Sequence, residues 1–374
     1  MRRSLLVAVA VALLGSLPAA QTGLPGTLSG TLSGTTSGTA DFYFIDTEGG
    51  QAVLIVSPVP GILGAKETLL IDAGNLNPPG RDADRIQAAM KDAGVERIDT
   101  LVVSHYHGDH SGGVAALADR VPIRRILDPG PYTPEMNGAR AAGFLSYLTV
   151  RQKAIVAVAK PGQRIPVAGL DIHVVSSAGE LITAPVPGIR RAANPLCASP
   201  QRRRQDNTPN NYESVGIVVE FGRFRYLDLA DLTWNQELEL VCPSNLLGTM
   251  SVYRTTRHGT EWSGAQALVH STRPRVAVMN NNPTKGGVAT TFEILKNSPG
   301  LEDVWQLHFS DNVAKDANAP EPFIANFTDG DAGHYIKLAA RSDGSFTVLN
   351  GRNMFTKTYP GAGPGSDRQE KSGN

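Results

Sequence analysis

Along most of the chain, apolar residues either alternate with polar ones or form short apolar runs between Gly- and Pro-containing turns. Both patterns are typical of β-strands. In the first third of the chain they predict strands at residues 41–45, 51–57, 68–71 and 100–104. Before the last of these, Ile86, Met90 and Ala93 recur with the spacing of one helical face, and Gly94 suits the end of a helix that begins at Arg81.

The rest of the chain continues this mixture of strands and helices. Helices are expected at residues 136–160, 234–240, 264–270 and 290–296. Strands are expected at residues 171–176, 214–220, 223–229, 251–255, 275–279, 305–309, 335–339 and 345–349. Because no compositional break separates the two halves, we expect one domain over residues 41–360, with sheets whose outer faces are covered by helices.

The two ends of the chain differ from this domain. Two arginines precede an apolar run at residues 5–14 and a pair of alanines, which is typical of a secretory signal peptide over residues 1–20. That run is shorter than the roughly 20 residues of a membrane span. We therefore expect a secreted or periplasmic protein with no membrane span in the mature chain, and an uncleaved anchor is the alternative. Residues 21–40 are expected to form a flexible Gly/Ser/Thr linker, and residues 361–374 a polar tail.

The amino-acid composition limits which classes of binding partner we expect. The chain has 35 Lys and Arg residues and 35 Asp and Glu residues, so it carries no net charge. Without a basic surface field, strong nucleic-acid binding is not expected. The two cysteines, Cys197 and Cys242, form an even number in an oxidising compartment, which favours a disulfide bond, and two buried free thiols are the alternative.

The densest group of metal-ligand residues directly follows the fourth expected strand. It is the sequence HYHGDH at residues 105–110, which contains three of the 8 histidines. Imidazole and carboxylate ligands suit zinc, and Mn²⁺ or Fe²⁺ accept the same ligands. We expect His105 and His107 to hold one ion, while Asp109 and His110 face a second. Water bound there would be acidified to a hydroxide nucleophile, and a His-rich surface loop is the alternative.

The pattern His-x-His-x-Asp-His resembles the signature of the metallo-β-lactamase fold superfamily. This resemblance implies an α/β (α+β) fold, an αββα sandwich of two mixed β-sheets with helices on the outer faces and a metal site at one edge. Over residues 41–282 the chain most resembles exported relatives of the metallo-β-lactamase-like domain in DNA-uptake competence (ComEC-type) proteins. The motifs that carry this likeness are FIDTEGGQA (44–52), LLIDAG (69–74), HYHGDH (105–110), NYESV (211–215), YLDLAD (226–231) and TTRHG (255–259).

The resemblance implies two further metal ligands by position. Asp231 stands where the superfamily has a carboxylate that bridges both metals, with Asp228 as the competing carboxylate and a helix N-cap as the alternative role. His258 matches the last metal-binding region, and a solvent-exposed loop histidine is the alternative. The residues expected to act in catalysis are Asp109, which would orient the water or accept its proton, and His258.

Two departures from the superfamily pattern bear on the number of metal ions. Where many members supply a third imidazole to the first ion, residues 206–211 offer only Asp206, Asn207, Asn210 and Asn211. His173 reads instead as an ordinary strand residue. Relatives commonly have paired histidines where this chain has Arg257 and His258. A single ion at the second position is therefore the leading expectation, and two ions are the alternative.

Five residues are expected to contact substrate or support the site. They are Asn211, Ser214, Arg257, Lys285 and His308. The alternatives are a surface arginine, a solvated turn around Lys285 and a packed strand residue at His308.

Together these patterns indicate an exported metal-dependent hydrolase that attacks an ester-type bond, in a phosphodiester or in a lactone- or β-lactam-like substrate. The resemblance to competence domains favours phosphodiesters, and the neutral charge gives small molecules equal weight. A metal- or ligand-binding module with degraded catalysis is the alternative. A third possibility is a structural surface protein carried on the Gly/Ser/Thr linker.

Overall fold

The structure, a computed structural model, describes residues 38–130, 139–199, 202–203, 208, 210–327 and 332–361. The predicted signal peptide and nearly all of the predicted linker and polar tail lie outside these residues. The described residues fall in one compact unit, residues 36–374. Among them we find no helix whose length and hydropathy would let it cross a bilayer.

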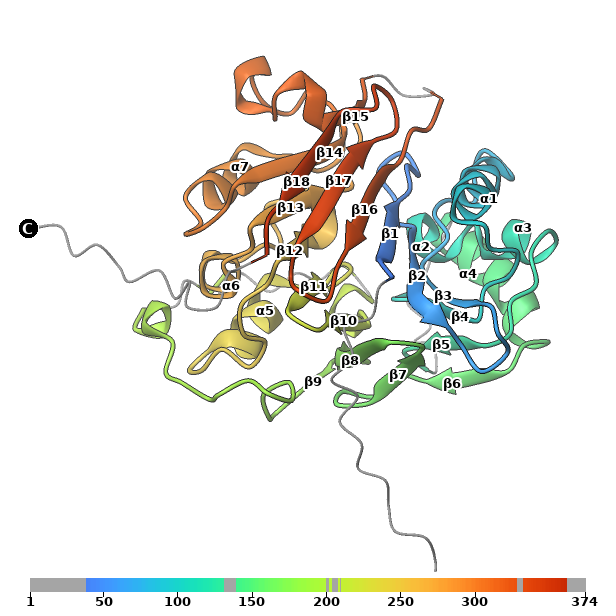
Figure 1. The fold of residues 1–374 in the computed structure, drawn as a ribbon, viewed down its shortest axis with the longest axis horizontal. Helices are drawn as coiled ribbons and strands as arrows, with labels where there is room; N and C mark the ends of the chain where they lie inside the picture. Colours follow the sequence, from blue (N-terminus) through green and yellow to red (C-terminus); the bar gives the residue numbers. More distant parts are fainter. Residues whose placement is uncertain are drawn as a thin grey trace, which may run out of the picture. The chain divides into compact units, whose positions relative to one another are not determined.

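The first sheet combines the beginning and the end of the described chain (Figure 1). It has 9 strands in the order β18-β17-β16-β1-β2-β3-β4-β5-β6. Their bounds are β1 Ala40–Phe44, β2 Val53–Pro60, β3 Lys66–Ile71, β4 Thr100–Val102, β5 Ile126–Asp128, β6 Val156–Val158, β16 Ile336–Ala340, β17 Phe346–Asn350 and β18 Thr356–Tyr359. Pairing is antiparallel from β18 to β3 and parallel from β3 to β6, so the sheet is mixed.

The second sheet is built from the middle of the chain. Its order is β15-β14-β13-β12-β11-β10-β8-β7, with β9 paired to β8. The bounds are β7 Arg164–Val167, β8 Leu170–Ser177, β9 Glu180–Leu181, β10 Gly216–Phe221, β11 Phe224–Asp228, β12 Val252–Arg254, β13 Val276–Met279, β14 Asp303–His308 and β15 Ile324–Asn326. Strands β11 to β15 are parallel, and the others pair in antiparallel fashion.

The main core lies between the two sheets, where alternate residues of each strand point inward. Phe42 of β1 meets Tyr226 of β11 with ring centroids 5.0 Å apart. A second apolar layer joins the first sheet to its helices, and a third joins the second sheet to its own helices. The helices are α1 Arg81–Ala93, α2 Gly108–Ser111, α3 Val114–Ala118 and α4 Ala139–Arg151 beside the first sheet, and α5 Trp234–Val241, α6 Gln266–Thr272 and α7 Ala289–Lys296 beside the second. The predicted αββα arrangement is therefore confirmed.

Several local predictions were wrong. Helix α4 ends at Arg151, and the last part of the helix predicted at 136–160 is the edge strand β6. Its residue Val156 pairs in parallel with Ile126, because the β-branched residues here complete the first sheet rather than a helical face. The expected elements also omitted the short strands β5, β7, β15 and β18.

A disulfide bond joins Cys197 to Cys242, as the even cysteine number predicts, with Cα atoms 5.6 Å apart. It links the short 3-10 helix η1 (Pro195–Cys197) to the end of α5. The amide of Asn194 donates to the carbonyl of Val241 (3.0 Å), so a hydrogen bond supports the same junction.

Candidate metal centre

The predicted metal ligands lie at the ends of neighbouring strands in both sheets. The segment 105–110 follows β4 and runs into helix α2. Asp231 follows β11, and His258 follows β12 within the 3-10 helix η3 (Thr256–Gly259). Adjacent parallel strands end at one edge of a sheet, where open α/β sheets carry their binding sites.

The backbone of the histidine segment is held from both sides. Gln51 donates its N–H to the carbonyl of Asp109 (3.0 Å), and Ala73 donates to the carbonyl of His110 (2.9 Å). The chain at Gly50 passes so close that a Cβ atom there would lie 2.4 Å from the Asp109 carbonyl oxygen. Only glycine fits that approach, so the turn after β1 helps to place the ligands.

The first ligand group consists of His105, His107 and Asp231, whose ligand atoms lie within 4.8 Å of one another. Nε2 of His105 is 3.0 Å from Nδ1 of His107. All three side chains are buried. Two nitrogen atoms so close together, with a carboxylate beside them, fit a shared cation.

The second ligand group consists of Asp109, His110 and His258, and Asp231 lies against it as well. Nε2 of His110 is 3.5 Å from Oδ2 of Asp109 and 3.4 Å from Oδ1 of Asp231. Nε2 of His258 is 3.4 Å from each of the same oxygens. Tetrahedral zinc with bonds of about 2.1 Å separates its ligand atoms by about 3.4 Å, so these distances fit such an ion.

Unpaired buried atoms at the centre support the same conclusion. Among the described residues, the buried atoms Nε2 of His110, Nε2 of His258 and Oδ1 of Asp231 have no hydrogen-bond partner. Each such atom costs about 1–3 kcal/mol when it stays unpaired. A bound cation satisfies a carboxylate oxygen and an imidazole lone pair together, so the donor set suits a metal ion.

A buried carboxylate supports two of the histidines from behind. Asp72 lies 2.7 Å from Nδ1 of His110 and also accepts the hydroxyl hydrogen of Ser104 (2.6 Å). Because the Ser104 hydrogen is used in this way, its oxygen is free to accept from Nδ1 of His105, 3.0 Å away. Both imidazoles thus have a partner at Nδ1 and turn Nε2 toward the centre, which is the arrangement that metal-binding histidines need.

The charges of the centre strongly shift its pKa values. Burial disfavours the imidazolium of His110, but Asp231, Asp109 and Asp72 together raise its pKa to about 10. Burial opposes ionisation of Asp109, yet Lys285 and His110 hold the pKa of this carboxyl well below its usual range. Burial likewise opposes ionisation of Asp231, and His258 and His110 bring its pKa well below the usual range. The protein thus holds two carboxylates ionised at this point.

The first ligand group is less basic. Burial, followed by the neighbouring His110 and His107, lowers the pKa of His105 well below its usual value. A histidine that stays neutral offers a lone pair to a metal ion without first losing a proton.

The predicted substrate residues fall into two sets. Lys285 lies at the rim of the centre and donates to Oδ2 of Asp109 and to the carbonyl of Gly49 (2.6 Å). Lys285 keeps 39% of its side chain exposed. Nη2 of Arg257 donates to the Thr208 hydroxyl (3.2 Å). The cation of Lys285 therefore lies beside one of the two carboxylates, while the Arg257 side chain contacts Thr208.

The other predicted substrate residues are buried. Oγ of Ser214 accepts from the backbone N–H of Asp231 (3.3 Å), so this residue positions a ligand. Asn211 is buried in the 3-10 helix η2 (Asn211–Glu213). His308 is fully buried, with Nε2 2.7 Å from Oδ1 of Asp46, and the structure does not bring it to the centre.

The His308 cluster is a third group of possible ligands. Asp46, Glu48 and His308 have ligand atoms within 4.8 Å of one another. Arg85 pairs with Asp46 at 2.7 Å and with Glu48 at 3.0 Å. Because the guanidinium already neutralises these carboxylates, the group reads as a buried ion-pair cluster.

The structure also places the competing residues. Asp228 joins a buried network with Arg254 (2.9 Å) and is in neither ligand group around the centre, unlike Asp231. His173 lies on β8 with Nε2 3.6 Å from Glu220, away from both groups. In the described part of the chain, the first group has no third imidazole, while Asp206 and Asn207 lie outside the described residues.

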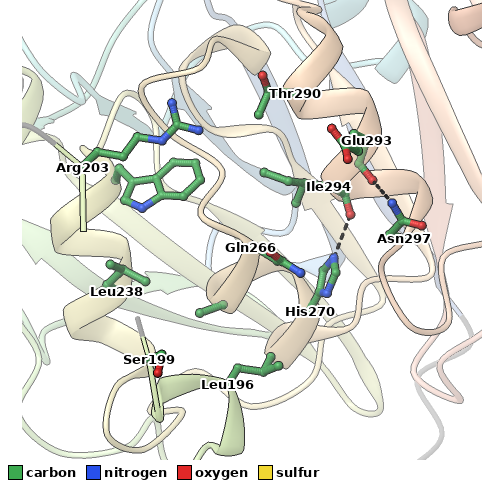
Figure 2. Close-up of a pocket in the computed structure, with 12 residues that line it drawn as sticks. Leu196, Ser199, Arg203, Leu238, Gln266, His270, Thr290, Glu293, Ile294 and Asn297 are labelled. Carbon is green, nitrogen blue, oxygen red and sulfur yellow. Dashed lines mark hydrogen bonds between the residues drawn. The ribbon is translucent and has the colours of Figure 1, made fainter. Parts of the chain in front are cut away.

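A separate pocket of about 320 Å³ lies among helices α5, α6 and α7. The guanidinium carbon of Arg203 lies 4.0 Å from the centroid of the Trp234 ring, and Figure 2 shows Arg203 at one side of the pocket. On its other side, Nε2 of His270 lies 2.9 Å from the Ile294 carbonyl oxygen. None of the residues in the two ligand groups lines this pocket, so it is distinct from the metal centre.

Three residues important to the centre carry no strong local signal in the sequence. Asp72 ends the apolar run of β3, and Ser104 ends that of β4, so a polar residue at a strand end is the only clue. Arg254 lies within the apolar strand β12 and is fully buried. A charged residue inside an apolar strand is a clue to a buried ion pair.

Residues 45–189 match the family model for the Metallo-beta-lactamase superfamily. No curated protein matches the chain in sequence. Similar solved structures include the metallo-beta-lactamase fold protein YhfI from Bacillus subtilis, with 11% identity over 72% of this chain and 96% of that chain and a TM-score of 0.43. A metallo hydrolase from Ignicoccus hospitalis shows 14% identity over 70% and 90% of the two chains, with a TM-score of 0.39. CmlA, a diiron beta-hydroxylase from Streptomyces venezuelae, shows 14% identity over 64% and 44%, with a TM-score of 0.33.

The family match covers the histidine segment, and the two facing sheets with outer helices have the architecture that the segment predicts. The likeness to the metallo-β-lactamase superfamily is therefore shown over residues 45–189, the part of the chain that contains the histidine segment.

Proposed function

We propose that this protein is an exported metal-dependent hydrolase of ester-type bonds. The observation that carries the proposal is the convergence of His110, His258, Asp109 and Asp231, whose facing ligand atoms lie 3.4–3.5 Å apart. A divalent ion bound there would acidify water and polarise the bond under attack. Zinc suits the ligands best, and Mn²⁺ or Fe²⁺ are alternatives.

The protein's own residues hold and orient the reacting groups. Asp231 lies between the two ligand groups and is fixed through its backbone by Ser214. Asp109 remains 23% exposed and ionised, so it can orient water or accept a proton at Oδ2. Lys285 contacts the same oxygen and keeps it in place until substrate arrives.

The number of ions follows from the two ligand groups. The second group has a full set of donors close to Asp231, whereas the first has only the imidazoles of His105 and His107 besides that carboxylate. We therefore propose one tightly held ion at the second group and a weaker position at the first.

The substrate is proposed to carry an anionic group beside the bond that is cleaved. Lys285 stands at the rim, Arg257 directly precedes His258 in the chain, and a guanidinium and an ammonium both bind phosphate or carboxylate oxygens. A phosphodiester agrees with the resemblance to competence domains. Lactone- or β-lactam-like molecules that carry a carboxylate would also be attracted by the positive charge of these basic residues. The neutral chain favours small substrates over long nucleic acids.

The proposal is tested by metal analysis together with a substrate panel. Protein purified without chelator is expected to contain about one equivalent of zinc, manganese or iron. It should hydrolyse at least one of a chromogenic phosphodiester, a lactone and a β-lactam. His107→Ala and Asp109→Asn are expected to reduce that turnover to background while the far-UV spectrum stays unchanged. If both variants hydrolysed the substrate at the wild-type rate, the catalytic assignment would be contradicted.

Two control variants test whether the losses of metal content and turnover are specific to the metal centre. His173→Ala removes a histidine of β8, and Asp84→Asn removes an exposed carboxylate whose side chain is 71% exposed. Both variants should keep full metal content and turnover.

The second candidate function is a metal- or ligand-binding module with degraded catalysis. The missing imidazole of the first group and Arg257 in place of a second histidine favour it. Metal content near one equivalent with no turnover across the panel would support this candidate over the hydrolase.

A further inference from the structure

The pocket among helices α5, α6 and α7 carries charges of opposite sign on its two sides. Figure 2 shows Arg203 on one side and Glu293 on the other, and both residues line the pocket. Among the described residues, the Arg203 guanidinium stacks on Trp234 and has no anionic partner, and the Glu293 carboxylate has no cationic partner. The pocket thus offers one cation and one anion that the protein itself does not pair.

Arg203 is held in place although it has no ion pair. Its backbone N–H donates to Oδ1 of Asn235 (3.1 Å), and its carbonyl oxygen accepts from Nδ2 of the same residue (3.0 Å). The Trp234 ring covers one face of the guanidinium, so the N–H groups at its edge can still donate to a carboxylate. Because the side chain is already ordered, binding an anion there costs little further conformational entropy.

The floor of the pocket is apolar. Trp234, Leu238 and Ala267 line it and are buried. Leu196 also lines the pocket and keeps 41% of its surface exposed, next to Cys197, whose disulfide bond fixes this segment. The apolar part of a ligand would cover this exposed leucine and remove its surface from water.

The side opposite Arg203 is formed by helix α7. Glu293 lies on the exposed face of this helix, with Thr290 and Asn297 beside it on the pocket wall. Nε2 of His270 in α6 donates to the carbonyl oxygen of Ile294 in α7 (2.9 Å). Because this bond ties the two helices together, the anionic side is as well positioned as the cationic one.

We infer that this pocket binds a short zwitterionic peptide, with its carboxylate on Arg203, its ammonium group on Glu293 and an apolar side chain on the floor. Charges on opposite sides of the pocket need a ligand whose own charges are separated, as they are in a dipeptide. A free amino acid carries both charges on one carbon. The volume of about 320 Å³ suits so small a molecule.

Calorimetric titration with leucyl-leucine and three related compounds tests this inference. The protein should bind leucyl-leucine at least about tenfold more tightly than its C-terminal amide or its N-acetyl derivative, because each derivative lacks one charge. Free leucine should also bind at least about tenfold more weakly, because its charges cannot reach both sides. Equal affinities for the four compounds, or no binding of leucyl-leucine at millimolar concentration, would overturn the inference.

Two variants assign each charge of the peptide to its side of the pocket. Arg203→Met should weaken leucyl-leucine binding by about tenfold and bind the acid and the amide equally within about twofold. Glu293→Gln should lose the preference over the N-acetyl derivative in the same way and keep the preference over the amide. If Arg203→Met still distinguishes the acid from the amide, the guanidinium is not the carboxylate site and the inference fails.

The neighbouring ion pair of Arg202 and Glu239 supplies matched controls. Their side chains are 60% and 52% exposed, and neither residue lines the pocket. Arg202→Met and Glu239→Gln remove the same charges and should keep peptide affinity within about twofold. Losses as large as those of the pocket variants would mean that general surface charge attracts the peptide, which would refute a built site.

Titration of metal-free and zinc-loaded protein separates this pocket from the metal centre. None of the residues in the two ligand groups lines the pocket, so the peptide affinity should be the same in both states. Binding that disappears on chelation would place the peptide at the metal centre and contradict the inference.

Discussion

The two sheets support the metal centre in different ways. On the first sheet, the ligands lie in one short segment, 105–110, and the buried carboxylate of Asp72 stands behind it with Ser104. On the second sheet, Asp231 and His258 come from separate loops that are tied together through Arg254. On the first side, the carboxylate of Asp72 stands behind the imidazoles, whereas on the second side the guanidinium of Arg254 connects the ligand loops.

This difference determines what each side can do for a metal ion. An anion behind an imidazole strengthens its lone pair, whereas a guanidinium that bonds several carbonyl and carboxylate groups fixes the loops that carry the ligands. The first side is therefore suited to strengthen its imidazole ligands, and the second to hold two ligand loops in place.

The largest expected effect comes from breaking the support on the second side. Arg254→Met removes the ion-pair partner of the buried Asp228 and the hydrogen bond to Asn280. The free energy of unfolding should therefore fall by about 3–5 kcal/mol. Urea denaturation of the metal-free protein measures this loss. Arg202→Met is the control, because its ion pair with Glu239 is 60% and 52% exposed and should change stability by less than about 1 kcal/mol. Equal stability of both variants would rule out a structural role for the network.

A buried acid on the same side gives a pH-dependent effect of intermediate size. Burial raises the pKa of Glu237 to about 7, although the N–H of Ala265 donates to its carboxyl (2.8 Å). Between pH 4.5, its ordinary pKa, and the folded value the folded state binds more protons than the unfolded chain. Stability from this group is therefore complete below pH 4.5 and is lost as pH rises through about 7, by about 3 kcal/mol in total.

Glu237→Gln should remove this slope. Urea denaturation at pH 5 and at pH 8 is expected to show a loss in the wild type that exceeds the loss in the variant by about 3 kcal/mol. Parallel pH profiles in the two proteins would mean that the carboxyl titrates normally.

On the first side, the expected effect is on metal affinity rather than on folding. Asp72→Asn removes the carboxylate behind His110, so zinc affinity should fall by about 10–100-fold. Competition with a chelator measures this change. Asp228→Asn, the matched change on the second side, is expected to leave zinc affinity within about threefold, since it supports Arg254 and no ligand directly.

The smallest effect is expected at Ser214. Its hydroxyl oxygen accepts the backbone N–H of Asp231 in a buried position, so Ser214→Ala should cost about 1 kcal/mol of stability. Ser146→Ala is a control on the opposite sheet's helix α4. A loss equal to that of Arg254→Met would mean that Asp231 depends on this one bond.

The same division explains what could be predicted from the sequence. The segment 105–110 is local, so its residue types and spacing alone indicated a metal site. Asp231 and His258 were found through a resemblance, because no local pattern joins them to that segment. Asn280 and Arg254 act through contacts between distant loops, and such contacts leave no periodic signal.

The fold was predictable where apolar patterns were long, as in the sheets around β1 and β11. It was missed at several strands of three or four residues, such as β5, β15 and β18, since so short a run shows no period, although β4 and β12 are as short and were predicted. The helix predicted at 136–160 was too long because Ile155 and Val156 fit either pattern until the partner strand is known.

The backbone of η3 has a consequence for the order in which the protein assembles. Arg257 and His258 both have left-handed backbone angles, with φ of 51° and 61°, which cost about 1–2 kcal/mol each in an isolated chain. Two hydrogen bonds hold this turn, one from Thr260 to the carbonyl of Arg257 (3.1 Å) within it and one from Arg257 to the carbonyl of Ala230 (2.8 Å) in the loop after β11. The turn at His107 and His110 closes by its own bond (3.0 Å). Because the bond to Ala230 joins two loops, the corner at residue 258 would be complete only once the loop after β11 is in place, whereas the histidine turn could close without it.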